Sequence, residues 1–120
     1  MLVVDDSEIV LAMASEALAA KGYEVSIALS ASDADRFIYS DKRPELIIMD
    51  IMMPMLDGDR KTRMLKGEVS TRDIPVLLLS SKPESELAKL AAESGADGYI
   101  RKPFTFRELT ASIEAVFVEN

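Results

Sequence analysis

The chain has 120 residues, of which 48% are hydrophobic and 29% are charged, and its formal net charge is −7. This length fits one domain with a core that can fold alone, and the acidic balance argues against a nucleic-acid surface, which needs a basic stripe. No apolar run approaches the roughly 20 residues that cross a bilayer. The absence of cysteine fits a reducing cytoplasm. Because the chain has no histidine, any chemistry must use carboxylates, hydroxyls, lysine or an oxygen-bound metal.

Strand-like and helix-like segments alternate along the whole chain. Short apolar runs predict strands that are buried on both faces, and apolar residues at helical spacing predict the helices between them. Ser30 is a candidate N-cap, and Gly22 and Gly95 fit helix ends. Pro83 fits the first turn of a helix, and residues 105–108 have the spacing of a capping box. In chain order we expect a strand at residues 2–4, a helix at 6–20, a strand at 23–28, a helix at 30–40, a strand at 45–50, a loop at 52–58 leading into a helix that ends near 66, a strand at 75–80, a helix at 83–94, a strand at 97–101 and a helix from 105 onward.

Five strands alternating with five helices predict an α/β fold with a single doubly wound parallel sheet flanked by the helices. No linker, repeat or low-complexity segment divides the chain, so we expect residues 1–120 to form one domain. The first strand starts almost at Met1 without a polar lead-in. This start indicates either a very short N-terminus or a domain trimmed from a longer protein.

Acidic, hydroxyl and ammonium groups follow four of the expected strands. Asp5 and Asp6 follow the first strand, Asp50 ends the third, Ser80 ends the fourth and Lys102 follows the fifth. In an open parallel sheet the ligand site lies outside the carboxyl ends of the strands, so we expect these groups to share one crevice. Three carboxylates repel one another unless a cation lies among them, and oxygen ligands suit Mg²⁺. An ammonium and a divalent cation beside one carboxylate would bind a dianionic phosphoryl group.

Each of these groups also has a purely structural explanation. One of the two adjacent aspartates could cap the first helix, the hydroxyl of Ser80 could bond the local backbone, and Lys102 could simply neutralise the acids. The peptide bond before Pro103 can be cis, which would aim the Lys102 ammonium back over the sheet. The methionines near the expected site are interpreted as core and loop packing rather than as ligands: Met49, Met52, Met53 and Met55.

Four segments have an order and a spacing typical of one family. They cover residues 3–6, 49–58, 75–81 and 95–104. In these segments, which extend over nearly the whole chain, the sequence resembles the receiver domain of bacterial two-component response regulators. The resemblance implies a flavodoxin-like sheet with strand order 2-1-3-4-5. It also implies a signalling domain that catalyses its own phosphorylation and dephosphorylation and is not otherwise an enzyme.

The resemblance also implies a role for each acidic residue. Asp50 would take a phosphoryl group from the phosphohistidine of a histidine kinase or a phosphotransfer protein. Asp5 and Asp6 would hold Mg²⁺, for which Mn²⁺ can substitute, together with Asp50 and the backbone carbonyl of Met52. Lys102 would bind the phosphoryl oxygens on the side opposite the metal.

A second group of implied residues concerns the switch. Ser80 would move to bond the phosphoryl group, and Tyr99 would turn inward behind it. Phosphorylation would then change the surface of the fourth helix, the fifth strand and the last helix, where a fused or separate effector or a second receiver binds. Direct contact with nucleic acid or membrane is not expected. Ser81 stands where the family usually has alanine lining the access of the phosphoryl group, so we expect it to alter the reaction rates. Met52 and Lys82 occupy positions that the family uses to tune dephosphorylation, so they bear on the lifetime of the phosphorylated form.

Three rival functions are less consistent with the residues. A flavodoxin-like cofactor binder needs a loop rich in glycine, serine and threonine after the first strand, and Asp5 and Asp6 would repel its phosphate. An aspartate-based phosphohydrolase needs a second acid two residues after its nucleophile, where this chain has Met52. A degenerate receiver that serves only for interactions would have lost Asp50, an acid of the pair or Lys102, and all are present.

Overall fold

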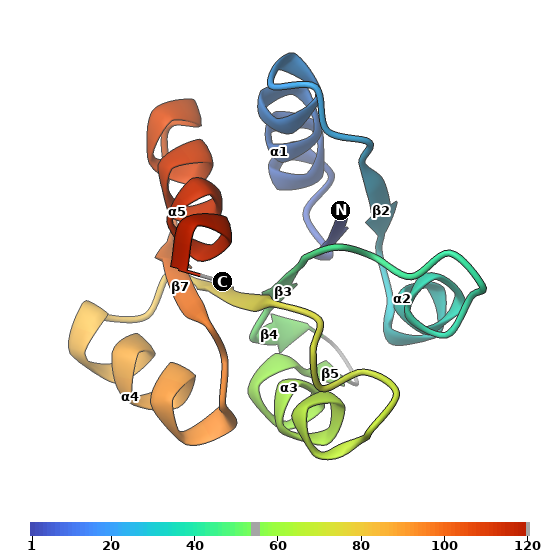
Figure 1. The fold of residues 1–120 in the computed structure, drawn as a ribbon. Helices are drawn as coiled ribbons and strands as arrows, with labels where there is room; N and C mark the ends of the chain where they lie inside the picture. The colour runs from blue at the N-terminus through green and yellow to red at the C-terminus, as the bar shows by residue number, and fades with distance from the viewer. Residues whose placement is uncertain (54–55, 120) are drawn as a thin grey trace.

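A parallel sheet of five strands forms the centre of the molecule (Figure 1). The computed structural model describes residues 1–53 and 56–119. The strand order is β2-β1-β3-β6-β7, which is the expected order 2-1-3-4-5 once the small hairpin β4-β5 is left out of the count. The strands are β1 (Leu2–Val4), β2 (Ser26–Ala28), β3 (Ile47–Asp50), β4 (Met52–Met53), β5 (Leu56–Asp57), β6 (Val76–Ser80) and β7 (Gly98–Arg101).

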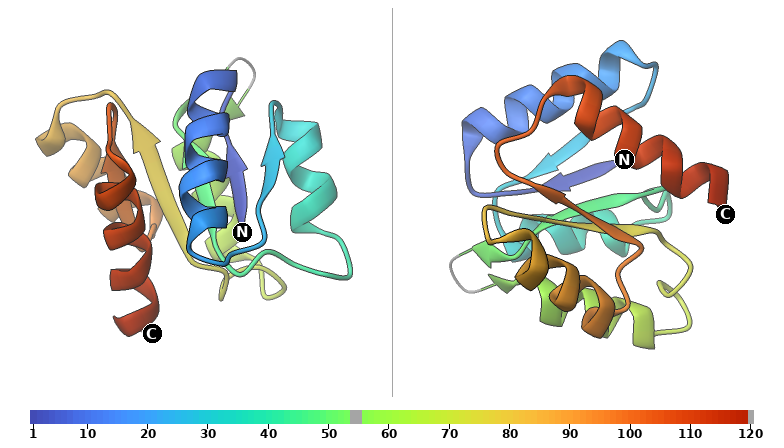
Figure 2. Two further views of the ribbon diagram at one scale, coloured as in Figure 1. Left: turned by 90° about the horizontal axis from the view of Figure 1, so that it is seen from above. Right: turned by 90° about the vertical axis from the view of Figure 1, so that its left-hand side faces the viewer.

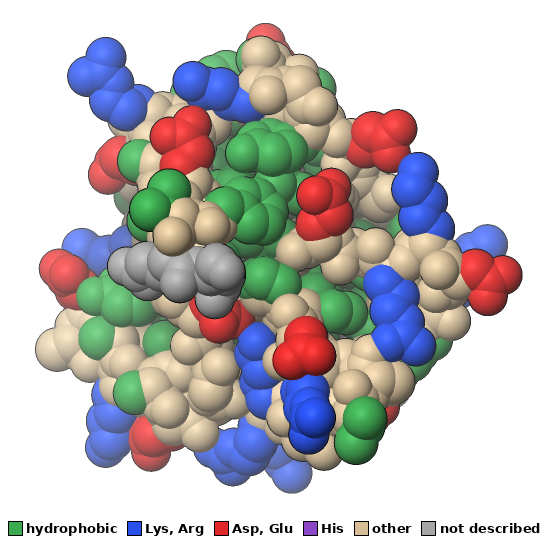
Figure 3. Space-filling view, in the orientation of Figure 1, with side chains coloured by type: hydrophobic (Ala, Val, Ile, Leu, Met, Phe, Trp, Pro, Cys, Tyr) green, Lys and Arg blue, Asp and Glu red, His purple; other side chains and the backbone are tan. Residues whose placement is uncertain are grey.

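Helices cover both faces of the sheet, as the alternating pattern predicts (Figure 2). One half of the core lies under α1 and α5, and the other lies under α2, α3 and α4. Figure 3 shows hydrophobic side chains at the surface between α1 and α5. None of the helices in the described residues has the length and the apolar character that crossing a membrane requires. The helices are α1 (Glu8–Ala20), α2 (Ala31–Ile38), α3 (Gly58–Gly67), α4 (Glu84–Ser94) and α5 (Phe106–Glu119).

Several helix ends follow the predicted signals. The hydroxyl of Ser30 accepts a hydrogen bond from the backbone N–H of Asp33 (3.2 Å), so Ser30 caps α2. Gly95 ends α4 with φ 81°, a left-handed conformation that glycine adopts without steric cost. Thr105 and Glu108 form the reciprocal capping box at the start of α5, with bonds of 3.1 Å and 3.0 Å. These caps satisfy backbone groups that the first or last turn of a helix leaves unpaired.

Several boundary predictions were wrong, including the third strand, which begins at Ile47 and not at residue 45, and the second helix, which ends at Ile38 and not at residue 40. The first helix begins at Glu8 and not at residue 6, because Ser7 is its N-cap. The second strand is Ser26–Ala28 and not 23–28, because β1 offers only three partners for pairing. Pro83 is the N-cap of α4 and not part of its first turn. The segment expected to be a loop at 52–58 contains the antiparallel pair β4-β5, in which Met52 pairs with Asp57 and Met53 with Leu56; Pro54 and Met55 lie outside the described residues.

Candidate functional site

The carboxyl ends of four parallel strands meet at one edge of the sheet. Asp50 ends β3 and is paired in register with Leu79 of β6, and Ser80 ends β6 opposite Arg101 of β7. Asp5 follows β1, which pairs with β3 on its other side. Because strands in register end at the same level, residues from distant parts of the sequence come together, such as Asp5, Asp50 and Ser80. The structure thus brings the carboxyl ends of these strands to one edge, as the sequence predicts.

Three carboxylates form a cluster at this edge. Each of Asp5, Asp6 and Asp50 offers one carboxylate oxygen, and the three oxygens lie within 4.8 Å of one another. Asp5 is fully buried and Asp50 is 4% exposed, whereas Asp6 is exposed to solvent. Two of the acids are therefore shielded from water, and the third leaves the cluster open on one side.

Backbone N–H groups position the two buried acids. The N–H of Ser7 donates to Asp5 Oδ1 (2.9 Å), and the N–H of Met52 donates to Asp50 Oδ1 (3.2 Å). The hydroxyl of Ser7 accepts from the N–H of Val10 (3.3 Å) and caps α1. The structural explanation that an aspartate of the pair caps this helix was therefore wrong. Asp5 instead holds the turn that precedes the cap.

Lys102 lies against the two buried carboxylates. Its Nζ is 2.8 Å from Asp5 Oδ2 and 3.5 Å from Asp50 Oδ2, and the peptide bond to Pro103 is cis. Asp5 Oδ2 accepts no hydrogen bond in the described part of the structure, so the ammonium is its main source of compensation. The lysine does neutralise acids, as the structural explanation requires. One ammonium among three carboxylates nevertheless leaves a net negative charge in the crevice.

The environment of Asp50 disfavours its charged form. Burial, followed by the negative charge of Asp5, raises the pKa of the Asp50 carboxyl to about 6, against the opposing effects of the Met52 N–H and the Lys102 ammonium. A divalent cation placed among these acids would oppose this shift. The donor set fits Mg²⁺, because it consists of oxygens alone, carries excess negative charge and has one solvent-exposed member that leaves room for water ligands.

The two expected switch residues occupy different surroundings. Ser80 is 3% exposed, and its hydroxyl accepts from the backbone N–H of Lys82 (3.1 Å), which is the local bond that the structural explanation predicts. Tyr99 lies on β7, and its hydroxyl donates to Glu84 Oε1 on α4 (3.3 Å). The bond between Tyr99 and Glu84 is exposed to solvent, so the Tyr99 hydroxyl lies at the surface of the molecule.

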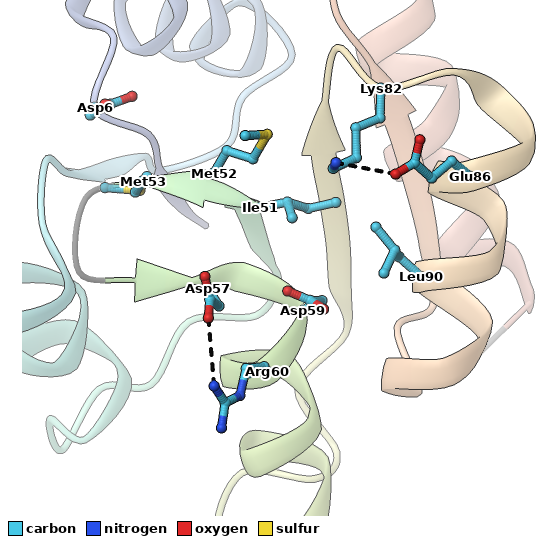
Figure 4. Close-up of a pocket in the computed structure, with 10 residues that line it drawn as sticks. All are labelled: Asp6, Ile51, Met52, Met53, Asp57, Asp59, Arg60, Lys82, Glu86 and Leu90. Carbon is cyan, nitrogen blue, oxygen red and sulfur yellow. Dashed lines mark hydrogen bonds and ion pairs between the residues drawn. The ribbon is translucent and has the colours of Figure 1, made fainter.

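A cavity of about 750 Å³ opens beside the acidic cluster (Figure 4). Asp6 and Met52 line one side of it, and Lys82 and Glu86 form an ion pair (3.2 Å) on another. The nearby methionines were expected to serve core and loop packing: Met49 and Met53 are buried, whereas the Met52 side chain is 65% exposed and does not pack, and Met55 lies outside the described residues. Met52 lies in the hairpin strand β4, which turns its side chain toward this cavity.

Gly58 supports the site in a way that the sequence did not indicate. It begins α3, and its N–H donates to the carbonyl of Ile51 (3.1 Å). A Cβ at this position would collide with the carbonyl oxygen of Asp50 and would lie 2.9 Å from Ile51 Cα. The sequence signals were a glycine at the expected start of a helix, which has many ordinary explanations, and its place at the end of the segment 49–58. The close approach of α3 to the backbone of the candidate nucleophile depends on the tertiary fold.

We expect Gly58→Ala to destabilise the protein by about 1–3 kcal/mol, the usual cost of forcing an extra methyl group against fixed atoms. The obstacle is backbone, which cannot rotate away as a side chain could. Urea denaturation followed by circular dichroism measures the change. Gly67→Ala in the last turn of α3 is the matched control, because a Cβ there meets nothing within 4 Å. Equal stability of the two variants would contradict the prediction.

The family model for the response regulator receiver domain matches residues 1–114 of this chain. The chain belongs to the response regulator receiver family. Among curated relatives, the phosphate regulon transcriptional regulatory protein PhoB of Pseudomonas aeruginosa is 40% identical over 116 residues, which are 97% of this chain and 50% of that protein. This receiver chain thus spans about half the length of the curated relatives it matches.

Solved structures support the same assignment. The signal receiver domain of a signal transduction histidine kinase from Syntrophus aciditrophicus is 33% identical with a TM-score of 0.85, over 98% of this chain and 89% of that one. The chemotaxis response regulator CheY4 of Vibrio cholerae is 28% identical with a TM-score of 0.87, over 96% of this chain and 95% of that one. The receiver domain described here is therefore a signalling domain of the two-component type.

Proposed function

We propose that residues 1–120 act as one phosphoacceptor domain, in which Asp50 receives a phosphoryl group from a phosphohistidine of a partner histidine kinase or phosphotransfer protein in the cytoplasm. The observation that carries this proposal is the position of Asp50, which is buried within reach of two further acids and one ammonium at the carboxyl edge of the sheet. No stability argument calls for this arrangement, because it leaves an excess of buried negative charge.

The proposed transfer of the phosphoryl group is a nucleophilic displacement at phosphorus. A carboxylate oxygen of Asp50 attacks the phosphorus atom, and the new O–P bond forms as the P–N bond to the partner's imidazole breaks. The electron pair of that bond stays on the imidazole nitrogen, which takes a proton from water. Positioning and charge stabilisation supply most of the catalysis in such transfers. The product is an acyl phosphate, and its hydrolysis would return the domain to its starting state.

The remaining acids would hold the metal. Asp5 and Asp6, with Asp50 and the backbone carbonyl of Met52, would bind Mg²⁺ or Mn²⁺, which neutralises charge on the incoming phosphoryl oxygens when bound. The buried position of Asp5 and the exposed position of Asp6 support this metal site, because one side of the cluster stays open to water and to the phosphodonor. Lys102 would bind the phosphoryl oxygens from the side of the two buried acids.

The output of the domain would depend on Ser80 and Tyr99. Among the residues that the structure describes, the hydroxyl of Ser80 accepts one hydrogen bond and donates none, so its hydrogen can be donated to a phosphoryl oxygen. We propose that this bond draws the loop after β6 inward, that Tyr99 follows, and that the surface of α4, β7 and α5 changes for a second receiver or for a fused or separate effector. Transcriptional output, as the name of the PhoB relative implies for that protein, would then depend on another part or partner and not on DNA contact by this acidic domain.

The phosphoacceptor proposal has a direct test. On incubation with Mg²⁺ and a small phosphodonor such as acetyl phosphate, we expect mass spectrometry to show the gain of one phosphoryl group, stable in acid and labile in base. Asp50→Asn should abolish the adduct, because it removes the nucleophilic oxygen, and EDTA should prevent its formation. The exposed Asp73→Asn serves as the control and should be phosphorylated like the wild type. An adduct that survives Asp50→Asn would refute the assignment.

A further inference from the structure

Two side chains of β7 reach across to the segment that joins β6 to α4. The hydroxyl of Tyr99 donates to Glu84 Oε1 (3.3 Å), and Arg101 Nε donates to the backbone carbonyl of Lys82 (3.0 Å). Tyr99 and Arg101 are two positions apart on the strand, so they project from the same face. The segment is therefore attached to β7 at two points, one at its backbone and one at the first residue of α4.

The same segment begins directly after Ser80, whose hydroxyl is the candidate switch group. Ser80 Oγ accepts from the N–H of Lys82, and the carbonyl of this residue accepts from Arg101. The Ser80 hydroxyl is thus linked to the Arg101 contact of β7 through the backbone of one residue, Lys82. The Tyr99 ring packs partly against the core and lines a cavity of about 410 Å³, together with Glu84 and Arg101. The ring has open space beside it, so a hydrogen bond, and not close packing on all sides, sets its orientation.

We propose that Glu84 is a positioning residue that holds Tyr99 in its surface orientation and thereby opposes the phosphorylated state of the domain. This inference rests on the proposed function, in which Tyr99 turns inward after Ser80 binds the phosphoryl group. An interaction made in only one of two states shifts the balance toward that state. Partial burial, followed by the charge of Glu84, raises the pKa of the Tyr99 hydroxyl, which therefore remains a hydrogen-bond donor at neutral pH. Loss of the bond should favour the inward orientation.

The test measures binding of beryllofluoride, a mimic of the phosphoryl group, to the full chain with Mg²⁺. We expect Glu84→Ala to raise the apparent affinity about two- to fivefold, the lower end of the range for one hydrogen bond, because this bond is exposed to solvent. In NMR spectra without beryllofluoride, the Tyr99 ring resonances of this variant should shift toward their positions in the bound wild type. Glu84→Gln keeps an acceptor oxygen at the same place and should restore most of the wild-type behaviour. Glu93→Ala, which removes an acid from the last turn of α4, should leave the affinity unchanged.

A double-mutant cycle separates this role from a general effect of Glu84 on α4. In the Tyr99→Phe background the hydrogen bond is already absent, so Glu84→Ala should no longer change the affinity. An effect of the same size in both backgrounds would overturn the inference, and so would an unchanged affinity of Glu84→Ala while the wild type binds beryllofluoride. If the wild type itself fails to bind, the proposed function fails and this inference fails with it.

Discussion

Lys102→Ala is expected to slow the phosphorylation of Asp50 by about 10²–10³-fold, which is typical for the loss of one preorganised charge at the reacting group. The ammonium is 2.8 Å from Asp5 and 3.5 Å from Asp50, and it is the cation seen at the two buried acids in the described structure. Its removal leaves the incoming dianion facing buried carboxylates with the metal alone to compensate. The initial rate of phosphorylation by acetyl phosphate at saturating Mg²⁺ measures the effect.

Two variants control this experiment. Lys102→Arg keeps the charge but replaces a compact ammonium by a planar guanidinium, so we expect it to recover only part of the rate. Lys89→Ala removes an exposed lysine of α4 and should phosphorylate at the wild-type rate. A rate for Lys102→Ala within about twofold of the wild type would show that the ammonium only neutralises Asp5, as the structural explanation holds.

The metal-free protein is expected to lose about 3 kcal/mol of stability through Asp50 as the pH rises from about 4 to about 6. Burial raises the pKa of this carboxyl from its model-compound value of 3.8 to about 6 in the folded state. Below pH 4 both the folded and the unfolded states bind the proton, and the group has no net effect. Between the two pKa values only the folded state keeps the proton, so the free energy of unfolding falls as the pH rises. Above about pH 6 the loss is complete.

Urea denaturation of the wild type and of Asp50→Asn at a series of pH values, with EDTA present, isolates this contribution. The difference in the free energy of unfolding should move in favour of Asp50→Asn as the pH rises through this interval, because the amide carries no charge to bury. Excess Mg²⁺ at pH 7 should stabilise the wild type by mass action if it binds only the folded state. A difference between the two proteins that stays constant from pH 4 to pH 7 would contradict the expected role of Asp50.

Local chemistry in the sequence was enough to locate the five strands of the parallel sheet, though not the hairpin β4-β5, and the edge at which the site lies. Runs such as Ile47–Asp50 and Val76–Ser80 are buried along their whole length, as continuous hydrocarbon predicts for a sheet covered on both faces. Because parallel strands end in register, the polar residue after each run necessarily lies at the same edge of the sheet. The extent of β2 did not follow in this way, since it depends on how many residues β1 offers for pairing.

The sequence by itself thus determined the alternation of elements, the helix caps at Ser30, Gly95 and Thr105, and the residue types of the crevice. The tertiary structure alone decided which groups touch. It placed the Tyr99 hydroxyl on Glu84, and α3 against the backbone of Asp50. Periodicity and capping act over a few residues and can be inferred from neighbours in the chain. Contacts between distant segments, and the burial that raises the pKa of Asp50, depend on how the helices pack on the sheet.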